Sequence, residues 1–334
     1  MKIFLSMILI FLTSCTGGST SDFTAHKDSS SYHLSLLIEP DAGRKAIIDT
    51  INHASEEIDG TMYLFTDKKI AQALYFAAKR GVKVRFLLEK SPYEYPDANQ
   101  KLIQFWKASS IHWHSVPQEN PMPQFNLYHA KSLIIDHKEL WIMTLNFTYH
   151  SFSHKNFQRN FIIVDKDKQD IKIVENIFSH DWQYKLQPLK FSAGSTVLAS
   201  PENMAQSLFD LLLSAKKNIE IYAAGLNNKK FMHILAQKAK EGVNIKIIYS
   251  EGLTEYDKKY LLGHDVHLYP LSQNHENHAK VIIVDNKIAY VGSANFTTAS
   301  LYKNRELGLL IQDQSTIKDL TQQFLKDENL SVKK

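Results

Sequence analysis

Two stretches of the chain share one pattern, HAKSLIID at residues 129–136 and HAKVIIVD at residues 278–285. Each carries a histidine, a lysine and an aspartate at the same spacing, and each is followed by Asn-Phe-Thr, at 146–148 and at 295–297. A lone His-x-Lys often arises by chance. Two complete copies with identical spacing instead predict an internal duplication that carries chemistry.

The residues around each lysine indicate where the pattern lies in a fold. Side chains alternate along a strand, so the histidine and lysine of one copy lie on the same face. The Leu, Ile and Val residues that follow are typical of a strand buried on both sides. We therefore expect a polar pair at the end of a buried strand, where a sheet meets its ligand crevice.

The duplicated set suits the cleavage of a phosphodiester. Such a bond needs a nucleophile, cations that neutralise the phosphoryl oxygens, and a proton for the leaving oxygen. Two histidines, whose unperturbed pKa is about 6.5, supply the first and the third near pH 7. Two lysines and two asparagines supply the second. The sequence thus predicts a phosphodiesterase that needs no metal.

The repeat extends far upstream of the two motifs. Residues 68–88 and 229–248 each read as an amphipathic helix, a glycine (Gly81 or Gly242) and an alternating strand. Helices that alternate with strands predict an α/β fold in which helices cover the sheet. An earlier helix and strand precede each unit, at 42–54 and 58–65 in the first half and at 203–215 and 219–224 in the second.

These patterns also set the domain boundaries. We expect a first half over 34–165, a second half over 196–330, and a connector over 166–195 that contains a helix at 171–182. The first half holds a longer stretch between its glycine and its motif, and residues 91–100 belong to it. We expect this insertion to gate the pocket.

With these residues the sequence resembles the phospholipase D superfamily, whose motif reads His-x-Lys-(x)4-Asp-(x)6-Gly-Ser-x-x-Asn or a close variant. The second copy matches a close variant of it, with Gly292 and Ser293 in place and Asn295 one residue nearer, and Glu306 looks like the family's downstream glutamate. The resemblance covers residues 34–315. It implies two duplicated α-β-α sandwich halves that form a pseudo-two-fold pair with one active site at their interface, so we expect a monomer.

The resemblance also implies a two-step mechanism without a cofactor or a metal. One histidine attacks phosphorus to give a covalent phosphohistidine, and the other protonates the leaving alcohol and then activates water. By analogy with two-motif members, His129 is the nucleophile and His278 the acid and base, while each motif aspartate orients a histidine or a lysine. The implied site comprises catalytic His129, Lys131, Asp136, His278, Lys280 and Asp285, phosphate-binding Asn146, Asn295, Thr144 and Ser293, and orienting Glu306.

The first copy departs from the family pattern. Met143 and Thr144 stand where glycine and serine are expected. No glutamate matches Glu306, since Arg159 or Asn160 falls there instead. Thr144 keeps the hydroxyl, whereas Met143 adds bulk that we expect to narrow the pocket or alter the phosphate site. We therefore expect an asymmetric pocket whose first copy sets substrate preference.

The first residues predict an exported lipoprotein. Residues 1–14 hold Lys2 and an apolar run too short to span a bilayer, which is typical of a secretory signal. They end in Leu-Thr-Ser before Cys15, the only cysteine, in a pattern that resembles the bacterial lipobox. A lone cysteine cannot form an internal disulfide, and lipid attachment gives it a purpose. We expect a tether over 15–33 and an extracytoplasmic body anchored to a membrane of the cell envelope.

The chain has 15 histidines, which raises the alternative of a metal site. His112 and His114 face one way on a predicted strand, and His275 lies close to His278 in the sequence. The sequence contains neither a His-Glu-x-x-His helix nor a cysteine cluster. We therefore predict no metal and interpret His112 and His114 as surface or structural residues.

Aromatic residues lie near the first motif, and two interpretations of them stay open. We favour packing, with an apolar lip that accepts an acyl chain or stacks a base as the alternative. The residues concerned are Tyr93, Tyr95, Phe125 and Tyr128.

Two enzymatic functions follow from the motifs. The first is hydrolysis of the head-group phosphodiester of phospholipids, which a membrane-anchored enzyme meets at its own surface. The second is cleavage of nucleic acid by an extracytoplasmic nuclease that uses the same residues. A formal charge of +4, from 39 basic and 35 acidic residues, does not favour nucleic acid. Two intact motifs argue against a protein with a decayed site.

Overall fold

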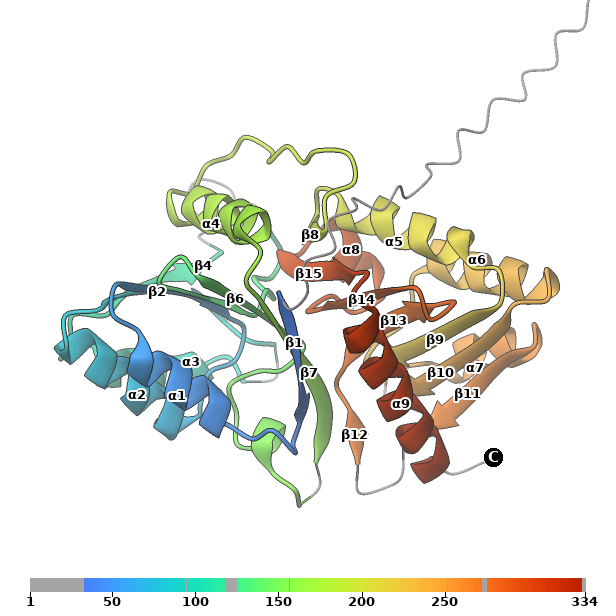
Figure 1. Ribbon diagram of the computed structural model, residues 1–334, viewed down its shortest axis with the longest axis horizontal. Helices are drawn as coiled ribbons and strands as arrows, with labels where there is room; N and C mark the ends of the chain where they lie inside the picture. Colours follow the sequence, from blue (N-terminus) through green and yellow to red (C-terminus); the bar gives the residue numbers. More distant parts are fainter. Residues whose placement is uncertain are drawn as a thin grey trace, which may run out of the picture. The chain divides into compact units, whose positions relative to one another are not determined.

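The computed structural model of the chain describes residues 33–93, 95–117, 125–155, 157–250, 252–271 and 275–331. The expected signal segment, Cys15 and the tether up to residue 32 lie outside the described residues. The described residues form two successive halves, each built on one mixed sheet (Figure 1).

The first half begins with a strand that later pairs antiparallel with the last strand of the same half. In chain order its elements are β1 (Leu34–Glu39), α1 (Lys45–His53), β2 (Glu57–Met62), α2 (Lys68–Lys79), β3 (Lys83–Glu89), α3 (Ala98–Trp106), β4 (His112–Val116), β5 (Ser132–Ile135), β6 (Glu139–Met143), the short 3-10 helix η1 (His150–Phe152) and β7 (Gln158–Asp165). The strands lie in the order β1-β7-β6-β5-β2-β3-β4.

The second half repeats this sequence of elements after the connecting helix α4 (Lys168–Trp182), which begins slightly before the predicted residue 171. Its elements are β8 (Val197–Ser200), α5 (Met204–Ser214), β9 (Asn218–Ala223), α6 (Lys229–Lys240), β10 (Asn244–Tyr249), α7 (Glu255–Leu262), β11 (Val266–Pro270), β12 (Glu276–Asn277), β13 (Lys280–Val284), β14 (Ile288–Gly292), α8 (Thr298–Tyr302), β15 (Glu306–Ile311) and α9 (Gln314–Leu330).

The two sheets have the same topology. The order β4-β3-β2-β5-β6-β7-β1 in the first half corresponds to β11-β10-β9-β13-β14-β15-β8 in the second. In each half the strand that begins at or directly after the motif lysine, β13 or β5, runs antiparallel to the central parallel strand, β9 or β2. This correspondence confirms the duplication and the α/β fold class that the sequence predicted.

The predicted helix-glycine-strand unit is present in both halves. Asp67 caps α2 by accepting hydrogen bonds from backbone N–H groups of its first turn, and Asn228 caps α6 at the equivalent place. Gly81 and Gly242 follow these helices with φ angles of +97° and +87°. Glycine adopts this left-handed conformation without strain, so the chain turns from each helix directly into the next strand.

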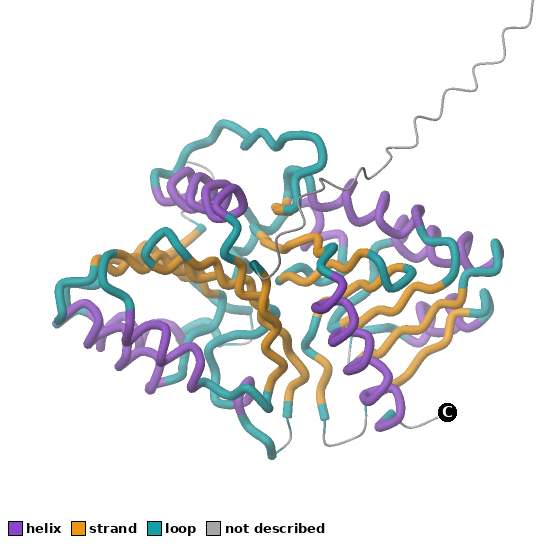
Figure 2. The backbone as a smooth tube through the Cα atoms, viewed as in Figure 1, coloured by secondary structure: helices purple, strands orange, loops and turns teal. Residues whose placement is uncertain are grey.

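The hydrophobic core has two layers because strand side chains alternate. On β6, Trp141 and Met143 face a cluster that contains α1, α2 and α3, whereas Leu140 and Ile142 face a second cluster that contains α4. The second cluster continues into the other sheet, since α4 contacts β6 and β8 and α9 contacts β1 and β13. Helices therefore cover both faces of the first sheet (Figure 2).

A pair of carboxyl groups, from the buried Asp165 and the half-buried Asp170, links the first sheet to the connecting helix. Asp165 ends β7, and Asp170 in the first turn of α4 lies beside it and accepts a hydrogen bond from Thr196 (2.5 Å). Burial, together with the nearby Asp170, raises the pKa of Asp165 to about 8. The fold therefore favours the protonated form of this pair.

Asp165→Asn is expected to stabilise the protein increasingly as pH rises. The folded pKa lies above the unfolded value of 3.8, so the contribution of Asp165 is fully present only below 3.8 and is lost as pH rises through about 8. An amide still accepts the hydrogen bond from the Asp167 N–H (2.8 Å) and needs no shared proton. Thermal unfolding should show a gain on the order of 1–3 kcal/mol above pH 8. Exposed Asp265→Asn is the control, and equal shifts in both variants would contradict the prediction.

Candidate active site

Each motif histidine lies on a segment that crosses to the other half. The His129 N–H donates to the carbonyl of Arg305, just before β15 of the second half (2.9 Å). The His278 N–H donates to the carbonyl of Arg159 on β7 of the first half (3.2 Å), next to the pairing of β12 with β7. One chain thus brings both motif copies to one site, as the resemblance implied.

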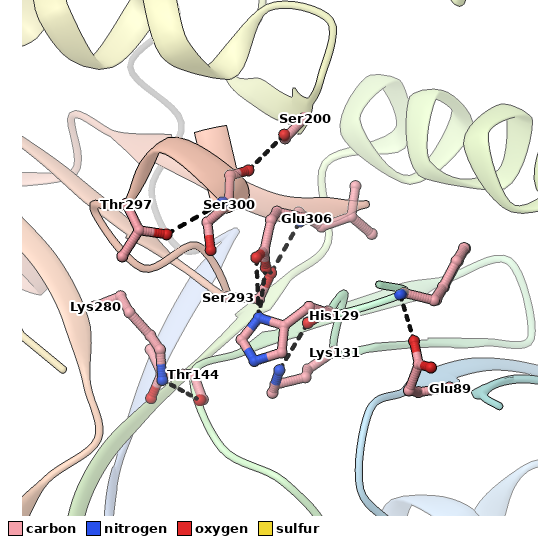
Figure 3. Close-up of polar contacts among 12 residues, drawn as sticks. Glu89, His129, Lys131, Thr144, Ser200, Lys280, Ser293, Thr297, Ser300 and Glu306 are labelled. Carbon is pink, nitrogen blue, oxygen red and sulfur yellow. Dashed lines mark hydrogen bonds and ion pairs between the residues drawn. The ribbon is translucent and has the colours of Figure 1, made fainter. Parts of the chain in front are cut away.

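The imidazole of His129 is held by a carboxylate from the second half (Figure 3). Its Nδ1 lies 2.8 Å and 3.0 Å from the two carboxylate oxygens of Glu306, which also accepts a hydrogen bond from the Ser293 hydroxyl (2.6 Å). Glu306 and Ser293 are completely buried. Since the carboxylate only accepts, Nδ1 of His129 carries the hydrogen and Nε2 keeps its lone pair.

The imidazole of His278 is held by an amide from the first half. Its Nδ1 lies 3.0 Å from Oδ1 of Asn160, and that oxygen also accepts a hydrogen bond from the Thr144 hydroxyl (3.0 Å). The sequence left open whether Arg159 or Asn160 occupies the place of the glutamate. The structure gives that place to Asn160, and Thr144 stands where Ser293 stands in the other copy.

The two motif lysines are fully buried between these histidines and the sheets. Lys131 donates to the carbonyl of His129 (2.7 Å), and its Nζ lies 5.2 Å from the ring centroid of Tyr63. Lys280 donates to the carbonyl of His278 (2.5 Å) and reaches the carbonyl of Thr144 in the other half (3.4 Å). Figure 3 shows Lys131 and Lys280 on either side of the His129 ring.

Burial lowers the pKa of all four basic groups. The pKa of His129 falls to about 4 and that of Lys131 to about 7, although Glu306 opposes both changes. Burial and then the neighbouring lysines bring the pKa values of His278 and Lys280 well below their ordinary range. Burial would raise the pKa of Glu306, but His129 and Lys131 hold it down. An anion among these groups favours their charged forms, so the site suits a negatively charged ligand.

The motif aspartates do not lie with the histidines, and the expectation that they orient a histidine or a lysine is wrong. Asp136 accepts hydrogen bonds from the backbone N–H groups of residues 55–57 (2.8–3.0 Å), and Asp285 from those of residues 216–218 (2.7–2.8 Å). Both stand in the turn after the motif strand, with φ of +50° and +52°. They fix the turn to the start of β2 or β9, at the end of the strand away from the motif lysine.

Met143 does not narrow the pocket, contrary to the sequence-based expectation. Its side chain is fully buried in the cluster with α1, α2 and α3. The corresponding Gly292 leaves room for the ring of Tyr290, because a Cβ there would lie 2.3 Å from the Tyr290 hydroxyl and 2.7 Å from Cα of Gly308. The difference between the copies at this position is one of core packing.

The two motif asparagines follow β6 and β14 on the side where these strands approach the site. Oδ1 of Asn146 accepts a hydrogen bond from the Leu64 N–H (3.3 Å). Oδ1 of Asn295 is buried and has no hydrogen-bond partner among the described residues. Their role in binding phosphate stays a prediction, and so does that of Thr144 and Ser293.

Two buried arginines that support the site were missed from the sequence. Arg305 makes a bidentate ion pair with Asp181 of α4 (2.8 and 3.0 Å), and Arg159 makes the matching pair with Asp327 of α9 (2.8 and 3.0 Å). Each arginine directly precedes the residue that holds a histidine. The sequence signal that could have revealed them is an arginine directly before the histidine-holding residue in both copies, Arg159-Asn160 and Arg305-Glu306.

The aromatic residues near the first motif divide into two groups. Phe125 and Tyr128 are buried, and Tyr128 donates to Asp181 (2.9 Å), so they pack. Tyr93 and Tyr95 are 86% and 58% exposed. The Tyr93 N–H donates to the hydroxyl of Tyr63 (2.7 Å), whose ring lies edge-on to His129 with centroids 4.7 Å apart. The loop after β3 therefore borders the site.

The remaining histidines show no metal arrangement in the described part of the chain, where no group of three or more His, Cys, Asp or Glu side chains could hold an ion. His114 instead stacks on Trp182, with ring centroids 4.0 Å apart.

Comparisons with known proteins agree with this geometry. A family model described as "Cardiolipin synthase, PLD-like domain" matches residues 47–182 and 208–328. A cardiolipin synthase of Clostridium perfringens is 26% identical over 92% of this chain and 74% of its own length. Two solved structures share the fold. A polyphosphate kinase from Porphyromonas gingivalis has a TM-score of 0.68 at 17% identity, over 87% of this chain and 49% of that one. A phosphatidylserine synthase from Haemophilus influenzae has a TM-score of 0.65 at 14% identity, over 89% and 85%.

Proposed function

This chain belongs to the family described as cardiolipin synthase, PLD-like domain, and on that premise we propose that it hydrolyses the head-group phosphodiester of phospholipids through a covalent phosphohistidine. It is an enzyme of phospholipase D type that acts on phosphodiesters, by hydrolysis or by phosphatidyl transfer.

The paired imidazoles carry the proposal. Nδ1 of each ring faces a side chain of the opposite half, Glu306 for His129 and Asn160 for His278. Nε2 of His129 is left for chemistry, and two buried lysines lie beside the rings, with Lys280 Nζ 3.2 Å from Nδ1 and 3.3 Å from Nε2 of His278. A nucleophile, a proton carrier and two cations are the groups that phosphodiester cleavage requires.

The proposed reaction has two steps. Nε2 of one histidine attacks phosphorus, the bond to the leaving oxygen breaks, and the second histidine gives that oxygen a proton. Water then attacks phosphorus, the second histidine takes a proton from the water, and the N–P bond breaks. Lys131 and Lys280 neutralise the phosphoryl oxygens in both steps. The products are phosphatidic acid and the free head-group alcohol.

An alcohol can take the place of water in the second step. The relative from Clostridium perfringens is named a cardiolipin synthase, so transfer to a lipid alcohol is the main competing outcome. Nucleic acid is the alternative substrate, because its phosphodiester meets the same groups. We favour a lipid because the chain is nearly neutral and the loop that borders the site exposes Tyr93 and Tyr95.

We propose that lipid attached to Cys15 holds a monomeric body at the extracytoplasmic side of a cell-envelope membrane. The support is the sequence pattern that ends at Cys15, and one chain supplies both histidines. Within the described part of the chain, no helix is sufficiently long and apolar to cross a bilayer. Acylation can be read directly from the mass of the N-terminal peptide of the exported protein.

One assay series tests the proposed function. The full chain in detergent is given vesicles of phosphatidylglycerol and phosphatidylethanolamine, cardiolipin vesicles, and single- and double-stranded DNA, each with and without EDTA. We expect phosphatidic acid from the phospholipid vesicles both with and without EDTA. Cardiolipin as the main product of phosphatidylglycerol would replace hydrolysis by transfer. Cleavage of DNA without action on lipid would establish the nuclease, and loss of activity in EDTA would contradict the metal-free mechanism.

The double variant Tyr93→Ser/Tyr95→Ser is expected to lose about 10-fold in activity on vesicles, because exposed tyrosine rings anchor in the head-group region. Turnover of soluble bis(4-nitrophenyl) phosphate should stay unchanged, since the Tyr93 backbone still donates to Tyr63. Phe76→Ser on α2 also removes an exposed ring and is the matched control. Equal losses on vesicles and on the soluble substrate would contradict a lipid-facing role.

A further inference from the structure

The residue after the central parallel strand differs between the two halves. Tyr63 follows β2, which ends at Met62, and Ala224 follows β9, which ends at Ala223. Both residues are half-buried. Their places in the repeated sheets are equivalent, so a phenol ring in one half corresponds to a methyl group in the other.

Tyr63 forms a wall of the site on the side of the first half. Its ring lies edge-on to His129 with centroids 4.7 Å apart, and Nζ of Lys131 lies 5.2 Å from the ring centroid. The Tyr63 hydroxyl accepts from the Tyr93 N–H (2.7 Å), and the Tyr63 carbonyl accepts from Nδ2 of the buried Asn99 (2.9 Å). The ring is therefore held beside the site and is joined to the loop that exposes Tyr93.

The equivalent wall in the second half is made of small residues. The Ala224 N–H donates to the carbonyl of Ala279, directly after His278 (3.2 Å). Gly225 comes next, and a Cβ on Gly252 would lie 3.0 Å from the Ala224 carbonyl oxygen, so the loop after β10 packs against the backbone here. At this position the side beside His278 has a methyl group where the other side has a phenol ring.

The two motif asparagines differ in the same sense. Oδ1 of Asn146 accepts from the Leu64 N–H (3.3 Å), whereas Oδ1 of Asn295 is buried and has no hydrogen-bond partner among the described residues. Gly225 takes the place of Leu64, and a Cβ on it would lie 3.5 Å from Cβ and Cγ of Asn295. A buried acceptor without a donor costs free energy, and a hydroxyl group of a bound alcohol would satisfy it.

We propose that Tyr63 is a specificity-determining residue that sets the direction of a phospholipid in the site, with the diacylglycerol part against Tyr63 and the head-group alcohol beside Ala224. This inference rests on the proposed function. The backbone of Tyr93 is bonded to the Tyr63 hydroxyl, and its exposed ring is one that the proposed function places in the head-group region of the membrane. The acyl chains stay in the membrane, so the part of the lipid that bears them lies on that side. The head group then points to Ala224, where a polyol such as glycerol has room and finds the acceptor of Asn295.

The same space receives the alcohol that replaces water in the second step, because an acceptor retraces the path of the leaving alcohol. The alcohol oxygen forms the new P–O bond on the side of Ala224, its proton passes to the histidine on that side, and the N–P bond breaks. The phosphatidyl group stays against Tyr63 throughout. Residue 224 therefore limits the size of the alcohol, and residue 63 contacts the part that is kept.

The matched substitutions Tyr63→Ala and Ala224→Tyr test the direction. The probes are phosphatidylmethanol and phosphatidylglycerol with the same short acyl chains, used below their micellar concentration so that binding to vesicles plays no part. Ala224→Tyr should raise the preference for phosphatidylmethanol, as a ratio of kcat/KM, about 30-fold, because only the larger head group meets the new ring. Tyr63→Ala should raise KM for both probes about tenfold and keep their ratio, because both share the diacylglycerol part.

Transfer gives a second measurement of the same space. With phosphatidylmethanol as donor and glycerol as acceptor, Ala224→Tyr should lower the ratio of phosphatidylglycerol to phosphatidic acid about tenfold. Tyr63→Phe keeps the ring and should recover most of the affinity that Tyr63→Ala loses. Exposed Tyr256 on α7 gives the control Tyr256→Ala, which should match wild type on both probes.

Thermal unfolding checks that each variant is folded, and Ala224→Leu, which adds less bulk, repeats the test if the tyrosine variant does not fold. A changed head-group ratio in Tyr63→Ala, or equal losses on both probes in the folded Ala224 variant, would overturn the direction. A wild-type enzyme that releases no phosphatidic acid from either probe would overturn the proposed function itself and the direction with it.

Discussion

Replacing His129 with alanine is expected to lower kcat by about 10⁴-fold or more, because the covalent route loses its nucleophile. The variant removes only the ring that lies between Glu306 and Tyr63, so the fold should persist. The measurement is phosphatidic acid released from phospholipid vesicles, with thermal unfolding as the check on folding.

His278→Ala should match this loss on phospholipid, because the leaving alkoxide then departs without a proton. Exposed His264, at the end of α7, provides the control through His264→Ala, which should keep wild-type kcat. Activity within tenfold of wild type in His129→Ala would show that the chemistry occurs elsewhere.

Lys131→Met is expected to lose about 10²–10³-fold in kcat/KM and at the same time to stabilise the protein. The lysine is fully buried, and its pKa of about 7 shows that burial outweighs the attraction of Glu306 and Glu89. Because the folded pKa lies below the unfolded value of 10.5, wild-type stability falls as pH drops from 10.5 to about 7. The methionine variant should therefore gain most below pH 7, on the order of 1–3 kcal/mol.

Kinetics and thermal unfolding, measured on one preparation, check the expected loss of activity and the expected gain of stability. Exposed Lys240 on α6 gives the matched variant Lys240→Met, which should change neither quantity. A Lys131→Met protein that is both less active and less stable would mean that the lysine supports the fold. The opposite directions of the two effects are what identify a residue kept for its chemistry.

Local patterns were enough to predict most of the fold and the centre of the site. The helix-glycine-strand units around Gly81 and Gly242 repeat at a constant offset, and each local signal has its own physical cause. Strand alternation places His129 with Lys131, and His278 with Lys280. Identical spacing in the two copies indicated a duplication, and the resemblance to the phospholipase D superfamily implied one site made by both halves.

The parts that could not be predicted depend on contacts between distant segments. Asp136 binds backbone groups of residues 55–57, and its partners cannot be read from its own motif. Met143 was expected near the phosphate because the matching residue is Gly292. The structure shows that Gly292 leaves room for the Tyr290 ring of its own strand and for the backbone of Gly308 on the neighbouring β15.

The residue that holds His278 was also ambiguous, because loop length differs between the copies and spacing alone cannot separate Arg159 from Asn160. The crossing of β12 to β7 decides it, since this pairing brings His278 against the carbonyl of Arg159 and directs its ring to the next side chain. The sequence of a single motif does not show which strands of the two halves pair with each other.

The crossing of each histidine to the opposite half also has an evolutionary meaning. If two identical chains formed this site, every mutation would change both copies at once, and Asn160 and Glu306 would always be the same residue. Encoding both copies in tandem lets selection act on one alone. Thr144, Asn160 and Met143 are the differences of this kind in the first copy. The single chain therefore contains two non-identical halves, whose site residues differ while the halves still pair with each other.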